Sequence, residues 1–152
     1  VEPDDGGQYG LRLGVLIGTP ETIQLIQSIE HPYPLNTLTL HIALFMFEHI
    51  DKTRTFIEHQ RALAVRLRQM FQDNVSDIMK VFPSSTNFVL TKGSAAQSLG
   101  LYIEDHGFLP RRYDEPNMND YVRYSIATDD QLDQLEQLIK SWRSQYDISK
   151  ET

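Results

Sequence analysis

The first forty residues alternate between strand-like and helix-like patterns. Residues 10–18 predict a strand, because every second position is apolar: Leu11, Leu13, Val15 and Ile17. Thr19 followed by Pro20 is a helix-start pattern, and an apolar stripe then extends to Ile29. The prolines of residues 31–36 disfavour a helix and indicate an extended crossing.

The next two predicted helices differ in polarity. Residues 38–50 are apolar nearly all round, which is typical of a helix buried on every side. In a chain this small, such a helix suggests burial against a partner subunit or another domain. Residues 51–74 instead form an amphipathic pattern with most arginines outside its apolar stripe. We therefore expect a long solvent-facing helix that connects two parts of the chain.

The second half has the pattern of a small α+β domain. Strands are predicted over 78–82, 87–91, 108–112 and 121–126, with helices over 94–106 and from 128 to about 145. Capping-box patterns begin both helices, at Ser94 with Gln97 and at Thr128 with Gln131, and Gly107 is placed to end the first.

These elements predict five segments along the chain. We expect a disordered or non-native tail at 1–8, a remnant of a larger domain at 9–50, a connecting helix at 51–74, a small domain at 75–145 and a frayed end at 146–152.

Composition excludes several functions. The chain has 152 residues, no cysteine, and a formal net charge of −7. The negative charge argues against nucleic acid or an anionic membrane as the main partner. Disulfides and thiolate chemistry are excluded. No apolar run reaches the roughly 20 residues of a membrane span, and we expect a cytoplasmic protein.

Three arginines are the best candidates for binding. Arg12, Arg111 and Arg123 each lie on or beside a predicted strand and point away from its apolar face. A guanidinium held on a strand suits a phosphate or a carboxylate. The simpler alternative is three unrelated surface arginines.

Other catalytic patterns are missing from the sequence. The histidines have no metal-ligand spacing, and there is no nucleophile elbow or phosphate-binding glycine loop. The acids at 129–136 are expected to form a solvated helix start that complements the helix dipole. We therefore predict no metal site and no complete catalytic group.

Three local strings, taken in order, resemble the fold-type I pyridoxal-phosphate enzymes, and within them histidinol-phosphate aminotransferase. They are Gly10-Leu11-Arg12-Leu13-Gly14 before Thr19-Pro20-Glu21, then His31-Pro32-Tyr33-Pro34-Leu35-Asn36, then Gly107-Phe108-Leu109-Pro110-Arg111 with Tyr121-Val122-Arg123-Tyr124-Ser125-Ile126-Ala127-Thr128. The likeness spans about residues 9 to 143 but only the C-terminal part of the family's length. It implies a C-terminal small domain, with about four mostly antiparallel strands and packed helices, plus an edge strand and helices of the large domain.

The resemblance also implies roles for the three arginines. Arg12 matches the arginine that holds the cofactor phosphate. Arg123 matches the arginine that clamps the substrate α-carboxylate, and Arg111 the arginine that faces the phosphate end of a histidinol-phosphate-like substrate. In such enzymes a lysine acts as nucleophile and proton carrier while the cofactor ring accepts electrons.

One position departs from the family. Asp4 stands where the family has the lysine that forms the Schiff base, and an aspartate cannot form an imine. The resemblance thus implies part of an aminotransferase of amino-acid (histidine) biosynthesis, inactive alone, with pyridoxal phosphate bound in the full-length homodimeric enzyme but not by this chain. Two alternatives stay open: part of a threonine-phosphate decarboxylase, or a non-catalytic remnant that dimerises or binds an anion.

Overall fold

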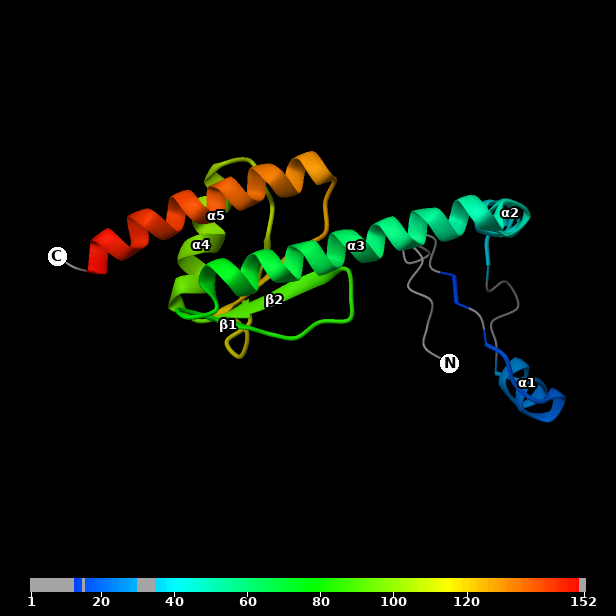
Figure 1. Cartoon of the computed structure of the whole chain (residues 1–152). Coiled ribbons are helices and arrows are strands. Elements are labelled where there is room, and N and C mark those ends of the chain that lie inside the picture. The colour runs from blue at the N-terminus through cyan, green and yellow to red at the C-terminus, as the bar shows by residue number, and fades with distance from the viewer. Residues whose placement is uncertain (1–12, 15, 30–34, 151–152) are drawn as a thin grey trace. The chain divides into compact units, whose positions relative to one another are not determined.

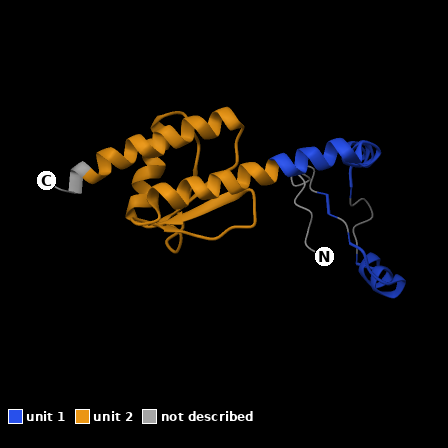
Figure 2. Ribbon diagram, viewed as in Figure 1, with its two compact units in different colours: residues 1–59 blue, residues 60–152 orange. Residues whose placement is uncertain are grey.

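The computed structural model describes residues 13–14, 16–29 and 35–150, with side chains described up to residue 147. It divides the chain into two units, residues 1–59 and 60–152 (Figure 2). The boundary falls inside a long helix, α3 (Ile50–Val75). The finer division into five segments stays a prediction.

Unit 1 contains two helices that begin where the sequence indicates. Helix α1 (Pro20–Gln27) is capped by the Thr19 hydroxyl, which accepts from the Thr22 amide at 3.4 Å. Helix α2 (Thr37–Glu48) is capped by Asn36, whose side chain accepts from the Thr39 amide at 2.8 Å. Both caps satisfy an amide that the helix itself leaves unpaired.

The predicted strand over 10–18 is not found in the residues that can be described. Residues 13–14 and 16–18 have no strand pairing, and the remainder of the segment lies outside the described residues. The alternation of apolar residues was a correct description of the sequence, but a strand also needs the backbone of a neighbour to pair with. No described segment of unit 1 supplies that neighbour.

Helix α2 is apolar but exposed. Within unit 1 only Thr39 and Ala43 of this helix are buried. Its large apolar side chains stay in contact with solvent, with Leu38, Leu44 and Phe47 each about three-fifths exposed or more. The helix is apolar nearly all round, as predicted. The described residues do not cover its large apolar side chains.

Unit 2 is built on a four-stranded antiparallel sheet. Its strands are β1 (Lys80–Val81), β2 (Phe88–Lys92), β3 (Arg111–Arg112) and β4 (Tyr121–Ser125), in the spatial order β1-β2-β4-β3. The long central pair places Leu90 opposite Arg123, and Thr91 opposite Val122. The small α+β domain expected from the sequence is therefore present, with shorter edge strands than predicted.

Three helices cover one face of this sheet (Figure 1): the C-terminal part of α3 (Ile50–Val75), α4 (Ser94–Asp105) and α5 (Asp129–Lys150). Their apolar side chains meet Val89, Val122 and Tyr124 of the sheet in a single core. The Phe71 ring of α3 lies 4.4 Å from the Tyr124 ring, centroid to centroid. The helices cover this face. The strand side chains that do not join the core lie on the opposite face, which we call the open face of the sheet.

Two of the three helix ends that the sequence predicts in unit 2 are confirmed. The Gln131 side chain accepts from the Thr128 amide at 3.1 Å, and the Thr128 hydroxyl accepts from the Gln131 amide at 3.4 Å. Gly107 ends α4 with a φ of +89°, while the amides of Gly107 and Phe108 donate back to Glu104 and Ile103.

The capping box predicted at Ser94 and Gln97 is wrong. The N-cap is Gly93, with no side-chain cap, and the Gln97 amide group instead donates to the Tyr121 carbonyl at 3.0 Å. A glutamine that can reach a neighbouring strand is drawn away from its own helix end. This bond joins α4 to β4.

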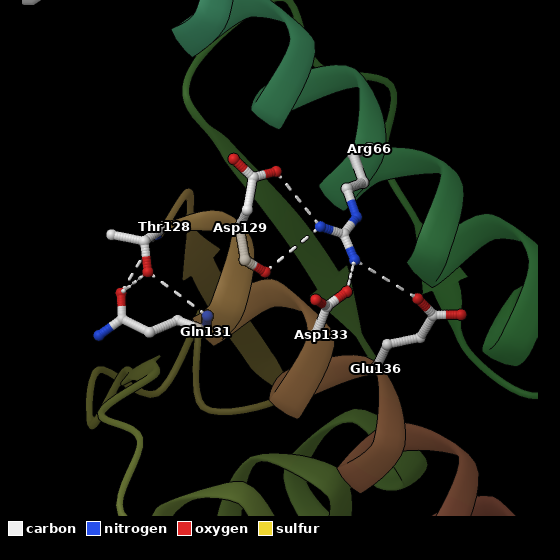
Figure 3. A network of polar contacts seen from close by, with 6 residues as sticks. All are labelled: Arg66, Thr128, Asp129, Gln131, Asp133 and Glu136. Atoms are coloured by element: carbon white, nitrogen blue, oxygen red, sulfur yellow. Dashed lines mark hydrogen bonds and ion pairs between the residues drawn. The ribbon is translucent and has the colours of Figure 1, made fainter.

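A cluster of acidic side chains at the start of α5 surrounds Arg66 of α3 (Figure 3). The guanidinium lies 3.4 Å from Asp129 and 3.9 Å from Glu136, and it also binds Asp133. The sequence predicted these acids to be a solvated helix start, but three of them also tie α5 to α3. The hydrogen bond with Asp133 is the main reason that the pKa of Arg66 is raised.

Among the helices of the described chain, none is both long enough and apolar enough to cross a membrane.

Candidate functional site

The position of Arg123 follows from the alternation of β4. Val122 and Tyr124 are buried against the helices at 0% and 3% exposure, so Arg123 between them projects from the opposite, open face of the sheet. This placement agrees with the sequence prediction that Arg123 points away from the apolar set.

The two arginines of β3 separate to the two faces. Arg112 pairs with Val122 and lies on the helix side, where it bonds Glu104 of α4 at 2.8 Å. Arg111 pairs with Arg123, so it lies on the open face. The sequence analysis marked Arg111 as a candidate that points away from the apolar face, and the register agrees and separates it from Arg112.

Arg111 and Arg123 are therefore directly opposed on the open face. Directly opposed residues of antiparallel strands have Cβ atoms about 5 Å apart, and two like charges in this arrangement repel each other. Neither arginine forms an ion pair with any residue that the structure describes. A carboxylate or phosphate between them would relieve that repulsion and accept from several guanidinium donors.

Aromatic rings lie beneath these cations. The Arg123 guanidinium carbon lies 5.2 Å from the centre of the Phe88 ring, and that of Arg111 lies 5.1 Å from the Tyr113 ring. An aromatic face attracts a cation without neutralising its charge. Both guanidinium groups are thus held in place while their charge stays available to an anion.

A second pair of opposed cations extends the same face. Lys80 lies opposite Lys92, and their amines lie over the rings of Phe82 and Tyr121 at 4.5 and 4.7 Å. The Lys92 amine also lies 3.6 Å from Asp120. In a chain of net charge −7, the open face concentrates four cations: Lys80, Lys92, Arg111 and Arg123.

The described residues do not complete a pyridoxal-phosphate site. Attachment of that cofactor needs a neutral lysine amine as nucleophile. The Tyr121 side chain first, and then Asp120, raise the pKa of Lys92 above its ordinary value. Arg12, the predicted cofactor-phosphate ligand, and Asp4, which the resemblance places at the family's lysine position, lie outside the described residues. The open face gathers cations, which suit anionic ligand groups.

Metal-ligating side chains do not gather in groups of three or more anywhere in the part of the chain that is described. The other polar clusters have structural roles. Ser84 hydrogen-bonds Thr86 and the Phe88 carbonyl in the connection between β1 and β2.

Comparison with known proteins identifies the class of protein. Residues 5–139 match the family described as aminotransferase class I and II, so the chain belongs to this family. It is 24% identical over 132 residues to histidinol-phosphate aminotransferase of Chromohalobacter salexigens, a match that covers 83% of this chain and 36% of the relative. With the enzyme of the same name from Hydrogenobaculum sp. it shares 30% over 138 residues, 88% of this chain and 38% of the relative. The chain thus spans little more than a third of these curated relatives.

Solved structures show the same fold. Histidinol-phosphate aminotransferase from Sinorhizobium meliloti, in complex with pyridoxal-5'-phosphate, aligns with a TM-score of 0.64 at 23% identity, over 92% of this chain and 39% of that one. L-threonine-O-3-phosphate decarboxylase from Porphyromonas gingivalis aligns with a TM-score of 0.64 at 21% identity, over 90% and 43%. The predicted aminotransferase fold, and the prediction that only part of its length is present, are confirmed.

Sequence reasoning missed three residues of unit 2 that shape this region. The sequence did not assign Arg112 and Arg66 to ion pairs. Their acidic partners lie on other elements, Glu104 on α4 and Asp133 on α5. Phe88 was treated as an ordinary strand residue. Its place at the start of a predicted strand, on the face opposite Val89, was the one available signal that it belongs to the open face.

Proposed function

We propose that this chain forms the substrate-binding C-terminal part of a pyridoxal-phosphate-dependent aminotransferase. In our proposal the longer enzyme exchanges an amino group between a phosphorylated amino-alcohol of the histidinol-phosphate kind and 2-oxoglutarate, in the cytoplasm and as a homodimer. The curated relatives are named histidinol-phosphate aminotransferases. The single observation that supports it most directly is the opposed pair Arg111 and Arg123 on the open face.

The two arginines have complementary roles in this proposal. Arg123 binds the α-carboxylate through a bidentate guanidinium contact, and Arg111 binds the phosphate. The phosphorylated amino-alcohol has no carboxylate, so its phosphate and the α-carboxylate of 2-oxoglutarate would occupy the opposed cations in turn, and each would relieve their mutual repulsion. Arg12 would hold the cofactor phosphate, a role that rests on the likeness of residues 10–14 to the family. Pyridoxal phosphate supplies the electron-accepting ring in the complete enzyme.

A binding experiment on the whole chain tests the role of the arginines. O-phospho-L-serine carries an α-carboxylate and a phosphate, and its titration should be followed by calorimetry or by amide chemical shifts. We expect Arg123→Ala and Arg111→Ala each to weaken binding by about tenfold, as for loss of a charged hydrogen bond. Arg112→Ala is the matched control, since Arg112 lies beside Arg111 but on the other face. Equal weakening in all three variants, or no binding by the unmodified chain, would contradict the assignment.

We further propose that the chain does not transaminate by itself, because Asp4 replaces the lysine of the family. An assay with pyridoxal phosphate, histidinol phosphate and 2-oxoglutarate should yield no glutamate above the level of free cofactor. Glutamate formation that depends on the chain would overturn this part of the proposal.

A decarboxylase-like part is the second candidate. The Porphyromonas gingivalis decarboxylase shares the fold to the same TM-score as the Sinorhizobium enzyme. Its substrate, as its name states, carries a phosphate and an amino-acid carboxylate, so the same opposed arginines would suit it. Carbon dioxide release from phosphothreonine by the longer protein, without amino transfer, would favour this alternative.

A non-catalytic role is supported by different observations. Asp4 and the exposed apolar side chains of α2 are both compatible with a remnant that dimerises and binds an anion weakly. Phosphoserine binding that survives Arg123→Ala, together with self-association through α2, would support this reading over the substrate-binding one.

A further inference from the structure

The guanidinium nitrogens of Arg123 differ in their surroundings. Its Nε atom is buried and has no hydrogen-bond partner among the described residues. Neither of its two Nη nitrogens is both buried and without a partner. A guanidinium has five donors arranged in a planar fork, and burial of one of them without an acceptor is unfavourable. Such a group persists when something else in the structure favours its position.

The residue in contact with this guanidinium is Phe88. Leu90 is directly opposite Arg123 in the β2–β4 register, so Phe88, two residues earlier on β2, is a diagonal neighbour on the same face. The guanidinium carbon lies 5.2 Å from the Phe88 ring centre, within the range of a cation–π contact. Phe88 itself is directly opposite Ser125, so the register sets its place relative to Arg123.

We propose that Phe88 is a positioning residue for Arg123, an inference that rests on the proposed function. Its ring holds the guanidinium with the Nε side turned away from water, so that the two Nη groups are the donors presented to an anion. An anion bound in this way lies end-on to the fork. The aromatic contact keeps the orientation without a carboxylate partner, which would compete with the ligand for the same positive charge.

The other phenylalanine of the open face provides a matched control. Phe82 also lies under a cation, but that cation is Lys80 at 4.5 Å, and its ring stacks on Tyr121 with centroids 5.9 Å apart. Substitution of Phe82 removes a ring of the same size from the open face. It leaves the contact between Phe88 and Arg123 in place. A difference between the two positions therefore reports on Arg123 and not on the sheet in general.

The test is a nuclear magnetic resonance measurement of the arginine Nε–H groups in the whole chain without ligand. Arg123→Lys assigns the Arg123 signal by removing it. In the unmodified chain we expect this signal to be shifted upfield by the ring and to exchange slowly with water. Phe88→Leu should abolish the ring shift and speed exchange by at least about tenfold, while Phe82→Leu should change neither. Phe88→Trp, which restores an aromatic face, should restore both.

Phosphoserine titration of the same variants completes the design. We expect Phe88→Leu to weaken binding about fivefold, and Phe88→Trp to recover most of the loss. An Arg123 signal that is unchanged by Phe88→Leu would overturn the positioning role, as would a loss of binding that tryptophan does not rescue. If the signal responds as expected but the unmodified chain binds no phosphoserine, the contact stands and the proposed function fails. The two proposals are therefore tested separately.

Discussion

Individual residues in unit 2 owe their roles to the face of the sheet on which they lie. Arg111 and Arg112 are adjacent and chemically identical, yet one faces solvent beside Arg123 and the other bonds Glu104. Successive strand residues point to opposite faces, so one step along the chain changes the partner completely. The same rule places Arg123 on the open face between two buried neighbours.

Gly107 provides a test of a single backbone conformation. Its φ of +89° lies in the left-handed region, and a Cβ there would meet no atom within 4 Å. Gly107→Ala should therefore destabilise unit 2 by about 1 kcal/mol through backbone strain alone, and Gly107→Asn by less. Urea unfolding followed by the fluorescence of Trp142, the single tryptophan, would measure this. Gly14→Ala, at a glycine with open space and no positive φ, should leave the midpoint unchanged.

Ion pairs connect the helices to the rest of unit 2. Arg143 of α5 binds Asp77, in the turn after α3, through both carboxylate oxygens at 2.6 and 2.8 Å, and it also binds Asp147. Arg66 makes a comparable connection from α3 to the start of α5. Both groups lie near the surface, where such pairs contribute modestly and are weakened by salt.

The Asp77 pair predicts a dependence of stability on pH. The hydrogen bond from Arg143 is the main reason that the pKa of Asp77 falls below its ordinary value of 3.8. A lowered folded-state pKa gives stability above the unfolded-state value that is lost as the pH falls through the folded-state pKa. We expect Asp77→Asn to be less stable than the unmodified chain at pH 7 and to lose less stability between pH 4 and 2.

Urea midpoints measured across this pH range would show whether the two unfolding curves converge in acid. Asp114→Asn is the control, because the exposed Asp114 has no ion pair with the described residues. Parallel pH curves for Asp77→Asn and the unmodified chain would contradict the assignment.

For the molecule as a whole, α2 is the main unexplained surface. A helix whose large apolar side chains are mostly in water is uncommon in a stable monomer. Leu44 and Phe47 are 58% and 63% exposed within the unit described. The chain spans little more than a third of its curated relatives, and no residue that the structure describes covers these side chains.

We predict that the isolated chain associates in solution through α2. Sedimentation over a range of concentrations should show species heavier than one chain, and the double change Leu44→Glu with Phe47→Glu should shift the population toward the monomer. Leu109→Glu is the control, since Leu109 is an exposed leucine of unit 2 at 88% exposure. A concentration-independent monomer for the unmodified chain would rule out association through this surface.

The sequence alone determined most of the local structure, because helix caps, helix-ending glycines and apolar periodicity act over a few residues. It placed α1, α2 and α3, the ends at Thr128 and Gly107, and the outward direction of Arg123. The tertiary structure decided what those residues meet. Strand register made Arg111 and Arg123 opposed neighbours and brought Phe88 beneath Arg123. Helix packing brought Arg66 to acids more than sixty positions away. A local pattern contains no information on which distant residue lies opposite, so neither the cationic open face nor the absence of a strand at residues 13–14 and 16–18 could be derived before the chain was folded.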